Sequence, residues 1–286
     1  MQAEYAWTPQ HVTDHVWQIP FPTPTLPPLD HTNTYLVTNR NRGLVIDVGT
    51  DNPEHLNWLS TFLKKIGVAH LELLATHHHI DHVAGLPKLA AVWQAPIYIH
   101  PVDARPACRR LGLSPLSVHA PPTAFDLAGI AVEVMHAPGH THGHLHVKIP
   151  QDCILLVGDN LSGIGTVWVG PPDGHMEDYL RTLDAVAAND GLLAGPGHGD
   201  ILPDARAAAE ATKQRRLRRE QEILSFIQQR PYTVAELRDQ IYGPSLAQGA
   251  QTVAIRTLKA HLQHLMEKRQ ARLIWREGKF YYQACR

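Results

Sequence analysis

The chain has 286 residues, of which 44% are apolar and 19% are charged, proportions typical of a folded protein with a buried core. It contains no uninterrupted run of about 18 apolar residues and does not begin with the basic and then apolar pattern of a signal peptide. We therefore expect neither a membrane span nor a secreted precursor. The three cysteines are too few and too scattered for a disulfide framework, which favours a cytoplasmic location.

Charge and histidine are unevenly distributed along the chain. Residues 1–210 carry 11 Lys and Arg against 21 Asp and Glu, whereas residues 211–286 carry 15 against 6. The acidic part also holds 18 of the 20 histidines. Because histidine is the commonest metal ligand and a basic segment attracts anions, the pattern predicts a metal site joined to a part that holds an anionic partner. A basic tail that is only a solvated surface explains the charge equally well.

Up to about residue 200, short β-branched runs alternate with amphipathic helical stretches. This interleaving predicts an α/β fold. The Pro-rich segment 20–28 is expected to be an extended surface segment. The predicted strands are 31–37, 43–48, 71–76, 96–99, 130–134, 145–149, 153–157 and 192–194, and the predicted helices are 53–66, 83–93 and 177–188.

From about residue 204 the pattern changes to longer helices and a terminal pair of strands. Thr233 and Glu236 have the spacing of a capping box, which opens a short helix. Three helices followed by a hairpin predict a winged-helix domain over residues 210–286, after a catalytic domain over residues 1–209. The predicted helices are 205–229, 234–242 and 251–268, and the strands flank the turn Glu277–Gly278.

Seven side chains with metal-binding chemistry lie in four short motifs. His77 and His79 are two residues apart at the end of a predicted strand, so they project to the same side. Later side chains also follow predicted strands, and strand ends on one rim of a sheet can converge from distant parts of the sequence. The motifs are THHHIDH, APGHTHGH, LLVGDN and GPGHGD, and the seven side chains are His77, His79, Asp81, His82, His140, Asp159 and His198.

This set resembles the metallo-β-lactamase superfamily in its two-metal hydrolase form, because every motif element occurs in the family's order. The resemblance implies an αββα sandwich that holds two divalent metal ions. Imidazole and carboxylate ligands suit Zn²⁺, Mn²⁺ or Fe²⁺, and we expect Zn²⁺. The resemblance further implies that the first metal is held by His77, His79 and His140 and the second by Asp81, His82 and His198. It also implies that Asp159 bridges both metals and that Asp47 supports the site.

Departures from other branches of the family narrow the resemblance. True metallo-β-lactamases usually carry Cys where Asp159 stands, and flavodiiron proteins carry Glu in place of His79. The segment between Asp159 and His198 is too short for the insertion of β-CASP nucleases. Glyoxalase II shares the THHHIDH motif but has a different, helical C-terminal part. The resemblance therefore favours the lactamase-beta-like subgroup with a C-terminal winged helix, whose members include nucleases that cut single-stranded RNA.

Our main hypothesis is a phosphodiesterase or nuclease that acts on single-stranded RNA or DNA. The third C-terminal helix is basic, and aromatic residues lie on the hairpin, so positive charge and stacking groups stand beside an acidic metal site. A metal-bridging hydroxide held by Asp159 and oriented by Asp81 would attack the phosphorus. The sequence features are the run Arg215–Arg219 and the aromatic residues Trp275, Phe280, Tyr281 and Tyr282.

Two other function classes stay open. The first is a small-molecule thioester, ester or lactone hydrolase with glyoxalase II-like chemistry, in which the winged helix is structural. The second is a regulatory nucleic-acid-binding protein with a vestigial metal site, against which the complete ligand set counts. The sequence also leaves open whether the protein is a homo-oligomer.

Overall fold

Two β-sheets packed face to face form the body of the molecule. The computed structural model describes residues 8–25, 29–243 and 248–285. One sheet has the order β1-β2-β3-β4-β5-β6 and the other the order β11-β10-β9-β8-β7. The first contains β1 (Gln10–His11), β2 (Val16–Pro22), β3 (His31–Asn39), β4 (Arg42–Ile46), β5 (His70–Leu74) and β6 (Ile97–Tyr98). The second contains β7 (Ala124–Leu127), β8 (Ile130–His136), β9 (Leu145–Ile149), β10 (Ile154–Gly158) and β11 (Leu193–Pro196).

Alternation along the central strands divides their buried side chains between two cores. Leu44 and Ile46 of β4 face the other sheet, where they pack with residues such as Val147. Val45, between them, faces the helices on the outside and packs with residues such as Leu59. This period of two is the geometry of a pleated strand that is buried on both faces.

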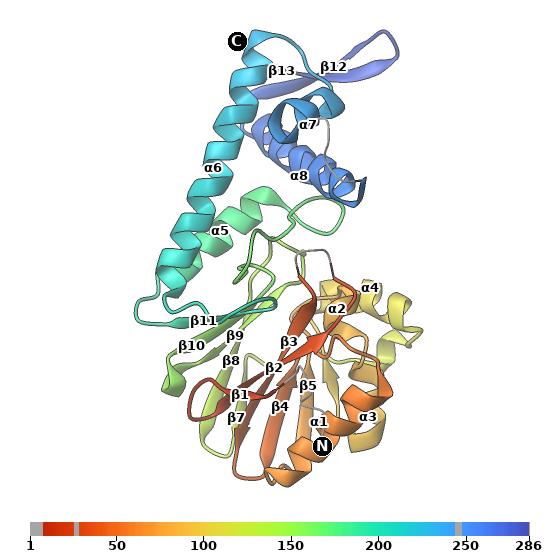
Figure 1. The fold of residues 1–286 in the computed structure, drawn as a ribbon, viewed down its shortest axis with the longest axis vertical. Helices are drawn as coiled ribbons and strands as arrows, with labels where there is room; N and C mark the ends of the chain where they lie inside the picture. The colour runs from red at the N-terminus through yellow and green to blue at the C-terminus, as the bar shows by residue number, and fades with distance from the viewer. Residues whose placement is uncertain (1–7, 26–28, 244–247, 286) are drawn as a thin grey trace.

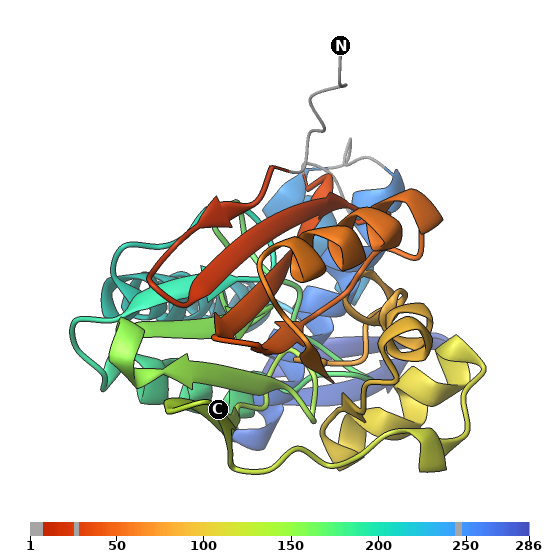
Figure 2. The same cartoon turned by 90° about the horizontal axis from the view of Figure 1, so that it is seen from below.

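Helices cover the outer faces of both sheets (Figures 1 and 2). The helices α1 (Pro53–Lys65) and α3 (Leu86–Trp93) pack on the first sheet. The helix α5 (Met176–Ala187) and the first turns of α6 (Ala205–Gln229) pack on the second sheet. The layers therefore follow the order helix, sheet, sheet, helix, which is the predicted α/β sandwich. The remaining short elements of the body are α2 (Ile80–Val83), α4 (Pro101–Leu111) and 3₁₀ turns at Pro115–Ser117 and Pro150–Asp152.

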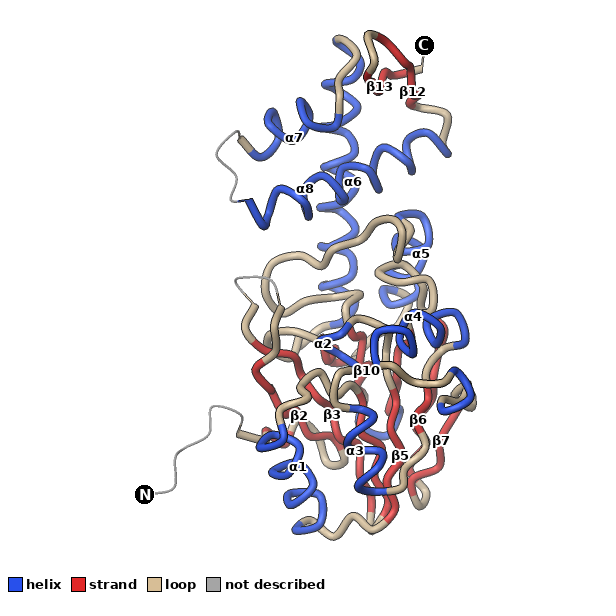
Figure 3. Tube along the Cα trace, turned by 90° about the vertical axis from the view of Figure 1, so that its right-hand side faces the viewer, coloured by secondary structure: helices blue, strands red, loops and turns tan. Residues whose placement is uncertain are grey.

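The C-terminal part lies at one end of the body and is joined to it by α6 (Figures 1 and 3). Ala205 and Ala209 of this helix pack in the core of the body, whereas Ile223 and Ile227 pack in a separate C-terminal core. The predicted domain boundary at residue 210 therefore falls inside one continuous helix. The other C-terminal elements are α7 (Val234–Tyr242), which has the predicted capping box, α8 (Gln248–Glu267), β12 (Ala271–Arg276) and β13 (Lys279–Ala284). The winged-helix assignment of these elements stays a prediction.

The structure differs from the expected elements at several places, and the strands β1, β2 and β7 were also not predicted. The predicted helix 83–93 is interrupted at Gly85, where a Cβ would lie 2.2 Å from the carbonyl oxygen of Thr50. Residues 20–22 of the Pro-rich segment belong to β2, with Phe21 fully buried, and residues 26–28 lie outside the described part of the chain. Helix α4 was not predicted, because polar residues and Pro106 mask its helical spacing. None of the described helices combines the length and apolar character that a membrane span requires.

Candidate metal centre

The seven predicted side chains converge on one rim of the sandwich. His77 and the residues that follow it come directly after β5, Asp159 after β10, and His198 after β11. Because β10 and β11 are parallel neighbours, their carboxyl ends reach the same edge of their sheet. His140 lies in the loop between β8 and β9. The convergence of strand ends therefore brings together residues that are up to 121 positions apart, from His77 to His198.

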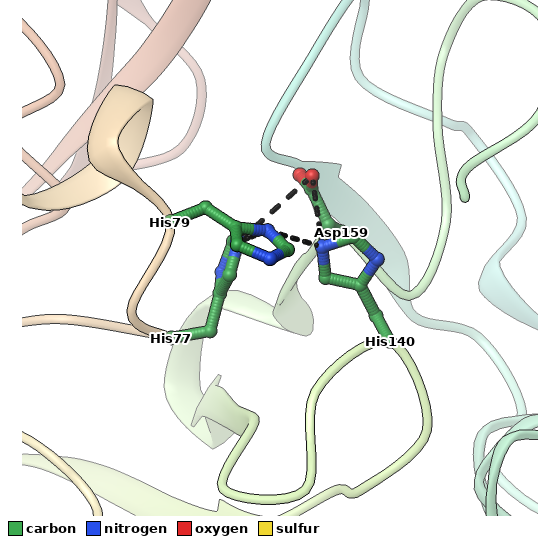
Figure 4. Close-up of side chains that lie close together, drawn as sticks. All are labelled: His77, His79, His140 and Asp159. Carbon is green, nitrogen blue, oxygen red and sulfur yellow. Dashed lines mark hydrogen bonds and ion pairs between the residues drawn. The ribbon is translucent and has the colours of Figure 1, made fainter. Parts of the chain in front are cut away.

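The first cluster consists of three imidazoles and one carboxylate (Figure 4). His79 Nδ1 lies 3.0 Å from His77 Nε2 and 2.8 Å from His140 Nε2. Asp159 Oδ2 lies 3.5 Å from His140 Nε2 and 4.0 Å from His77 Nε2. The four donor atoms thus point at a common centre, as the side chains of a metal site do.

The second cluster contains Asp81, His82 and His198. Asp81 Oδ2 lies 4.0 Å from His82 Nε2 and 3.6 Å from His198 Nε2. The other carboxylate oxygen of Asp159, Oδ1, lies 3.3 Å from His82 Nε2 and 3.4 Å from His198 Nε2. Each oxygen of Asp159 therefore faces one cluster, the arrangement expected of a bridging ligand.

The donor set fits divalent metal ions. Among the described residues, the buried atoms His82 Nε2 and Asp159 Oδ1 have no hydrogen-bond partner, although a buried polar atom normally has one. Both atoms face the second cluster. Imidazole nitrogen and carboxylate oxygen are ligands of first-row transition metals, so a cation among them would satisfy these atoms.

In the first cluster, the protonation states match those that metal ligands need. Burial, followed by the charges of His82, His79 and His140, lowers the pKa of His77. Burial and His79 likewise lower the pKa of His140 to about 4. Burial would raise the pKa of Asp159, but the charges of His198 and His82 outweigh it and hold that pKa well below its usual range. Neutral imidazoles beside an ionised carboxylate can bind a cation without first losing a proton.

The second-cluster histidines have the opposite shift. Burial lowers the pKa of His82, but the charges of Asp159, Asp47 and Asp81 outweigh burial and raise it. Asp159 similarly raises the pKa of His198 against the effect of burial. The physical reason is the higher density of carboxylates around this cluster, which would attract a cation as strongly as it attracts a proton.

A shell of hydrogen bonds orients the imidazole rings. His82 Nδ1 donates to Asp47 Oδ2 at 2.8 Å, and His198 Nδ1 donates to the carbonyl oxygen of His31 at 2.8 Å. His140 Nδ1 donates to the carbonyl oxygen of Trp168. These bonds leave each Nε2 as the free acceptor that faces a cluster, the usual effect of partners outside the ligand shell. Asp47 also accepts hydrogen bonds from Thr76, so its expected supporting position matches its place in the structure.

Two buried or half-buried aspartates near the site were missed by the sequence analysis. Asp103 accepts hydrogen bonds from the backbone N–H and the ring Nδ1 of His78, from Thr141 and from Gly143. Asp173 lies 3.5 Å from His79 Nε2 and 3.5 Å from His78 Nε2. Neither belongs to a recognisable motif, and only their contact with the histidine-rich segment reveals them.

A cavity of about 1110 Å³ lies over the clusters. Its wall includes five of the seven predicted side chains and is completed by α6 and α8 from the C-terminal part. The cluster side chains in the wall are His79, Asp81, His140, Asp159 and His198. The cavity is as large as sites that enclose whole small-molecule ligands. Because α6 and α8 form part of its wall, the C-terminal part helps to build this cavity and is not a remote module.

Curated relatives include several fungal thioesterases. The atrochrysone carboxyl ACP thioesterase nsrC of Aspergillus novofumigatus is 26% identical over 241 residues, covering 79% of this chain and 70% of the relative. A second atrochrysone carboxyl ACP thioesterase, of Emericella nidulans, is 28% identical over 196 residues, covering 68% and 59%. The lactamase-like protein notP of an Aspergillus species is 26% identical over 246 residues, covering 79% and 71%.

These relatives show that our main functional hypothesis is wrong. Proteins named as thioesterases of carrier-bound small molecules contradict a nuclease and a single-stranded RNA or DNA partner. The structure also shows why the basic run Arg215–Arg219 does not indicate a nucleic-acid surface. Arg216 is buried against the carbonyl oxygen of Val167, and Arg219 pairs with Glu222 at 2.9 Å, so the run is no continuous open surface.

Solved structures and a family model agree on the fold. A β-lactamase domain protein from Burkholderia ambifaria superposes with a TM-score of 0.84 at 19% identity, covering 97% of this chain and 93% of that one. The protein TTHA1623, solved in a di-iron-bound form, has a TM-score of 0.52 at 30% identity and covers 67% of this chain and 98% of its own. The family model described as metallo-beta-lactamase superfamily matches residues 27–198. With the His and Asp clusters, this match shows that the chain belongs to the metallo-beta-lactamase superfamily and is a metal-dependent hydrolase.

Proposed function

We propose that the protein is a two-metal hydrolase that cleaves small-molecule thioesters. The observation that carries the proposal is the position of both clusters in and beneath the wall of a large cavity. Much of the remaining wall is apolar and suits an acyl chain; it includes Leu29, Ile80, Ile164, Val167, Val253 and Ala254. The thioesterases among the relatives support the same reaction class.

The seven side chains divide into two ligand sets in this proposal. His77, His79 and His140 would hold one metal ion, and Asp81, His82 and His198 would hold the other, with Asp159 contributing to both. When bound, such ions polarise a carbonyl group and make water a nucleophile at neutral pH. Zn²⁺ remains our expected metal, with Mn²⁺ and Fe²⁺ as alternatives, and the solved structure of TTHA1623 in a di-iron-bound form supports iron among them.

The chain's own groups bind and orient the reactants. Asp81 lines the cavity, where its carboxylate can accept the proton that water loses as it attacks the thioester carbonyl carbon. Asp159 is held in place by its backbone N–H, which donates to His144 Nε2 at 3.1 Å. His144 thus serves as a hydrogen-bond acceptor for the backbone beside the clusters.

We also infer a role for the C-terminal part. Residues 1–209 form the catalytic domain and residues 210–286 a winged-helix domain, whose helices α6 and α8 close one side of the cavity. The three helices and the hairpin support this assignment.

The cysteines Cys108, Cys153 and Cys285 are all free, which supports a location in the reducing cytoplasm.

Thiol release from a panel of acyl thioesters tests the proposed function. The metal-loaded protein should release thiol, and Asp159→Asn and Asp81→Asn should lower kcat by about 100-fold or more, because each variant removes a charge that holds metal or proton. Asp126→Asn is the matched control, since Asp126 is exposed at the end of β7, away from the cavity. Hydrolysis of esters or lactones without any thioester hydrolysis would contradict the proposal, as would full activity of Asp159→Asn.

A further inference from the structure

We propose that arginine side chains of α6 bind the phosphate of a phosphopantetheine arm, placing the thioester at its other end over the metal clusters. The inference rests on the proposed thioesterase function and names its substrate class. Phosphopantetheine holds acyl groups as thioesters both on carrier proteins and in coenzyme A. Either source presents the same chemistry to the cavity: a phosphate, a chain with two amide groups, and a thioester.

The cavity wall contains arginines with no acidic partner. Arg215 and Arg218 of α6 and Arg110 of α4 line the cavity and are exposed. None of the three forms an ion pair with a described residue, and Arg215 donates only to Thr212 Oγ1, at 3.0 Å. By contrast, Arg219 on the same helix pairs with Glu222. The side chains of Arg215, Arg218 and Arg110 therefore offer uncompensated positive charge to an anionic ligand.

The spacing of the two α6 arginines suits one anionic group. Arg215 and Arg218 are three residues apart, so they lie one above the other on the same side of the helix. Guanidinium groups bind phosphate oxygens with paired hydrogen bonds, which a single amide or hydroxyl cannot match. Since the same cavity is lined by Asp81 and Asp159, a single extended ligand can contact the arginines and the clusters together.

Two aromatic side chains of the cavity wall have ring nitrogens that are left without partners in the described part of the chain. His261 and Trp168 line the cavity, and each has a buried ring nitrogen without a partner among the described residues. His261 Nδ1 faces Glu220 Oε1 at 3.4 Å, which leaves His261 Nε2 as an acceptor, whereas Trp168 Nε1 is a donor. The amides of the pantetheine chain have both the N–H and the C=O groups that such a wall would satisfy.

The reaction leaves the phosphate unchanged. Water adds to the thioester carbonyl carbon, the C–S bond breaks with its electron pair on sulfur, and the sulfur takes a proton. The products are a carboxylate, a free thiol on the phosphopantetheine arm and one released proton. The phosphate therefore contributes binding and orientation, and its effect is expected in kcat/KM of substrates that carry it.

The test compares one acyl group on carriers that differ in the phosphate. The substrates are its thioesters with pantetheine, 4′-phosphopantetheine, coenzyme A, a phosphopantetheinylated carrier protein and glutathione. The variants of the full-length protein are Arg215→Gln, Arg218→Gln and the double variant, with Arg276→Gln as control. Arg276 is also an exposed arginine of the C-terminal part, but it lies on β12 and outside the cavity wall.

We expect kcat/KM to be about 10-fold or more higher for phosphopantetheine than for pantetheine thioesters, equivalent to about 1.4 kcal/mol. The double variant should bring this ratio close to one, Arg276→Gln should keep it, and added salt should reduce it because salt screens exposed charges. A higher kcat/KM with coenzyme A or with the carrier protein identifies the source of the arm.

Two different failures are distinguishable. Equal kcat/KM for pantetheine and phosphopantetheine thioesters, an unchanged ratio in the double variant, or a preference for glutathione overturns the phosphate site while leaving thioester hydrolysis in place. Absence of hydrolysis for every thioester by the folded, metal-loaded protein refutes the proposed function itself, and the phosphate site with it.

Discussion

Asp103 offers a direct test of how the metal centre is supported. Asp103 is 1% exposed, and its side chain accepts four hydrogen bonds. Oδ2 accepts from the backbone N–H of His78 at 3.1 Å, from His78 Nδ1 at 2.9 Å and from Thr141 Oγ1 at 2.7 Å, and Oδ1 accepts from the backbone N–H of Gly143 at 2.8 Å. These bonds tie α4 to both of the loops that present His77, His79 and His140.

Electrostatics strengthen the network around Asp103. Burial would raise the pKa of Asp103, but the hydrogen bond and charge of His78 outweigh it and lower that pKa. Burial likewise would lower the pKa of His78, whereas its bonds to Asp103 and Asp173 raise it to about 9. At neutral pH the pair is therefore a buried carboxylate beside an imidazolium.

The substitution Asp103→Asn keeps the shape of the side chain and removes its charge. In the Asn side chain, an NH₂ group replaces one carboxylate oxygen and faces a hydrogen-bond donor. That buried donor then has no acceptor, and this loss costs about 1–3 kcal/mol. Removing one partner of a buried ion pair costs about 3–5 kcal/mol. Because these two costs overlap, we expect the free energy of unfolding to fall by about 3 kcal/mol and metal affinity by about 10–100-fold.

Urea unfolding of the metal-free protein and a metal titration measure the two effects. Asp51→Asn is the control, because Asp51 forms an exposed pair with Lys88 at 3.3 Å, and such pairs contribute only about 0–1 kcal/mol. If Asp103→Asn lowers the free energy of unfolding no more than Asp51→Asn does, and the metal affinity is unchanged, the supporting role of Asp103 is refuted.

Three further predictions concern a close approach, a buried charge and the C-terminal core. Gly49→Ala should destabilise the fold by about 1–3 kcal/mol and lower activity, because the new Cβ would lie 1.7 Å from the carbonyl oxygen of Asp81. An unchanged melting temperature together with full activity would show that the backbone there can move at little cost in free energy. Hydrogen bonds from His261 and His264 outweigh burial and lower the pKa of Glu220 from 4.5 to about 2. Ionised Glu220 therefore contributes about 3 kcal/mol to the free energy of unfolding above pH 4.5, and this contribution is lost as the pH falls towards 2. In urea unfolding, the difference in stability between the wild type and Glu220→Gln should shrink over that pH range. A constant difference would contradict this prediction. Leu258→Ala should cost about 2–5 kcal/mol in urea unfolding, because Leu258 is fully buried in the C-terminal core; a cost below about 1 kcal/mol would mean that this core repacks around the cavity.

Local pattern was sufficient to predict most elements of the fold. The helix at Pro53–Lys65 and the strands His31–Asn39 and Arg42–Ile46 were predicted within a few residues, because the helix buries one periodic set of apolar side chains and the strands are short runs buried on both faces. The interruption at Gly85 was missed, since there the backbone N–H donates to the carbonyl oxygen of Val48, which is too far along the chain for local periodicity to reveal. Local spacing specifies which face of an element is apolar, but not what that face meets.

The sequence by itself determined the chemistry of the site, and the tertiary structure decided its surroundings. The spacing of His77 and His79 predicts donors that share one side of a strand end, and this holds whatever packs nearby. The support from Asp103 and the place of Arg215 in the cavity wall depend on contacts between segments distant in sequence. A basic run reads the same on an open surface and in a cavity wall, and the packing of α6 against the body decides which of the two it forms.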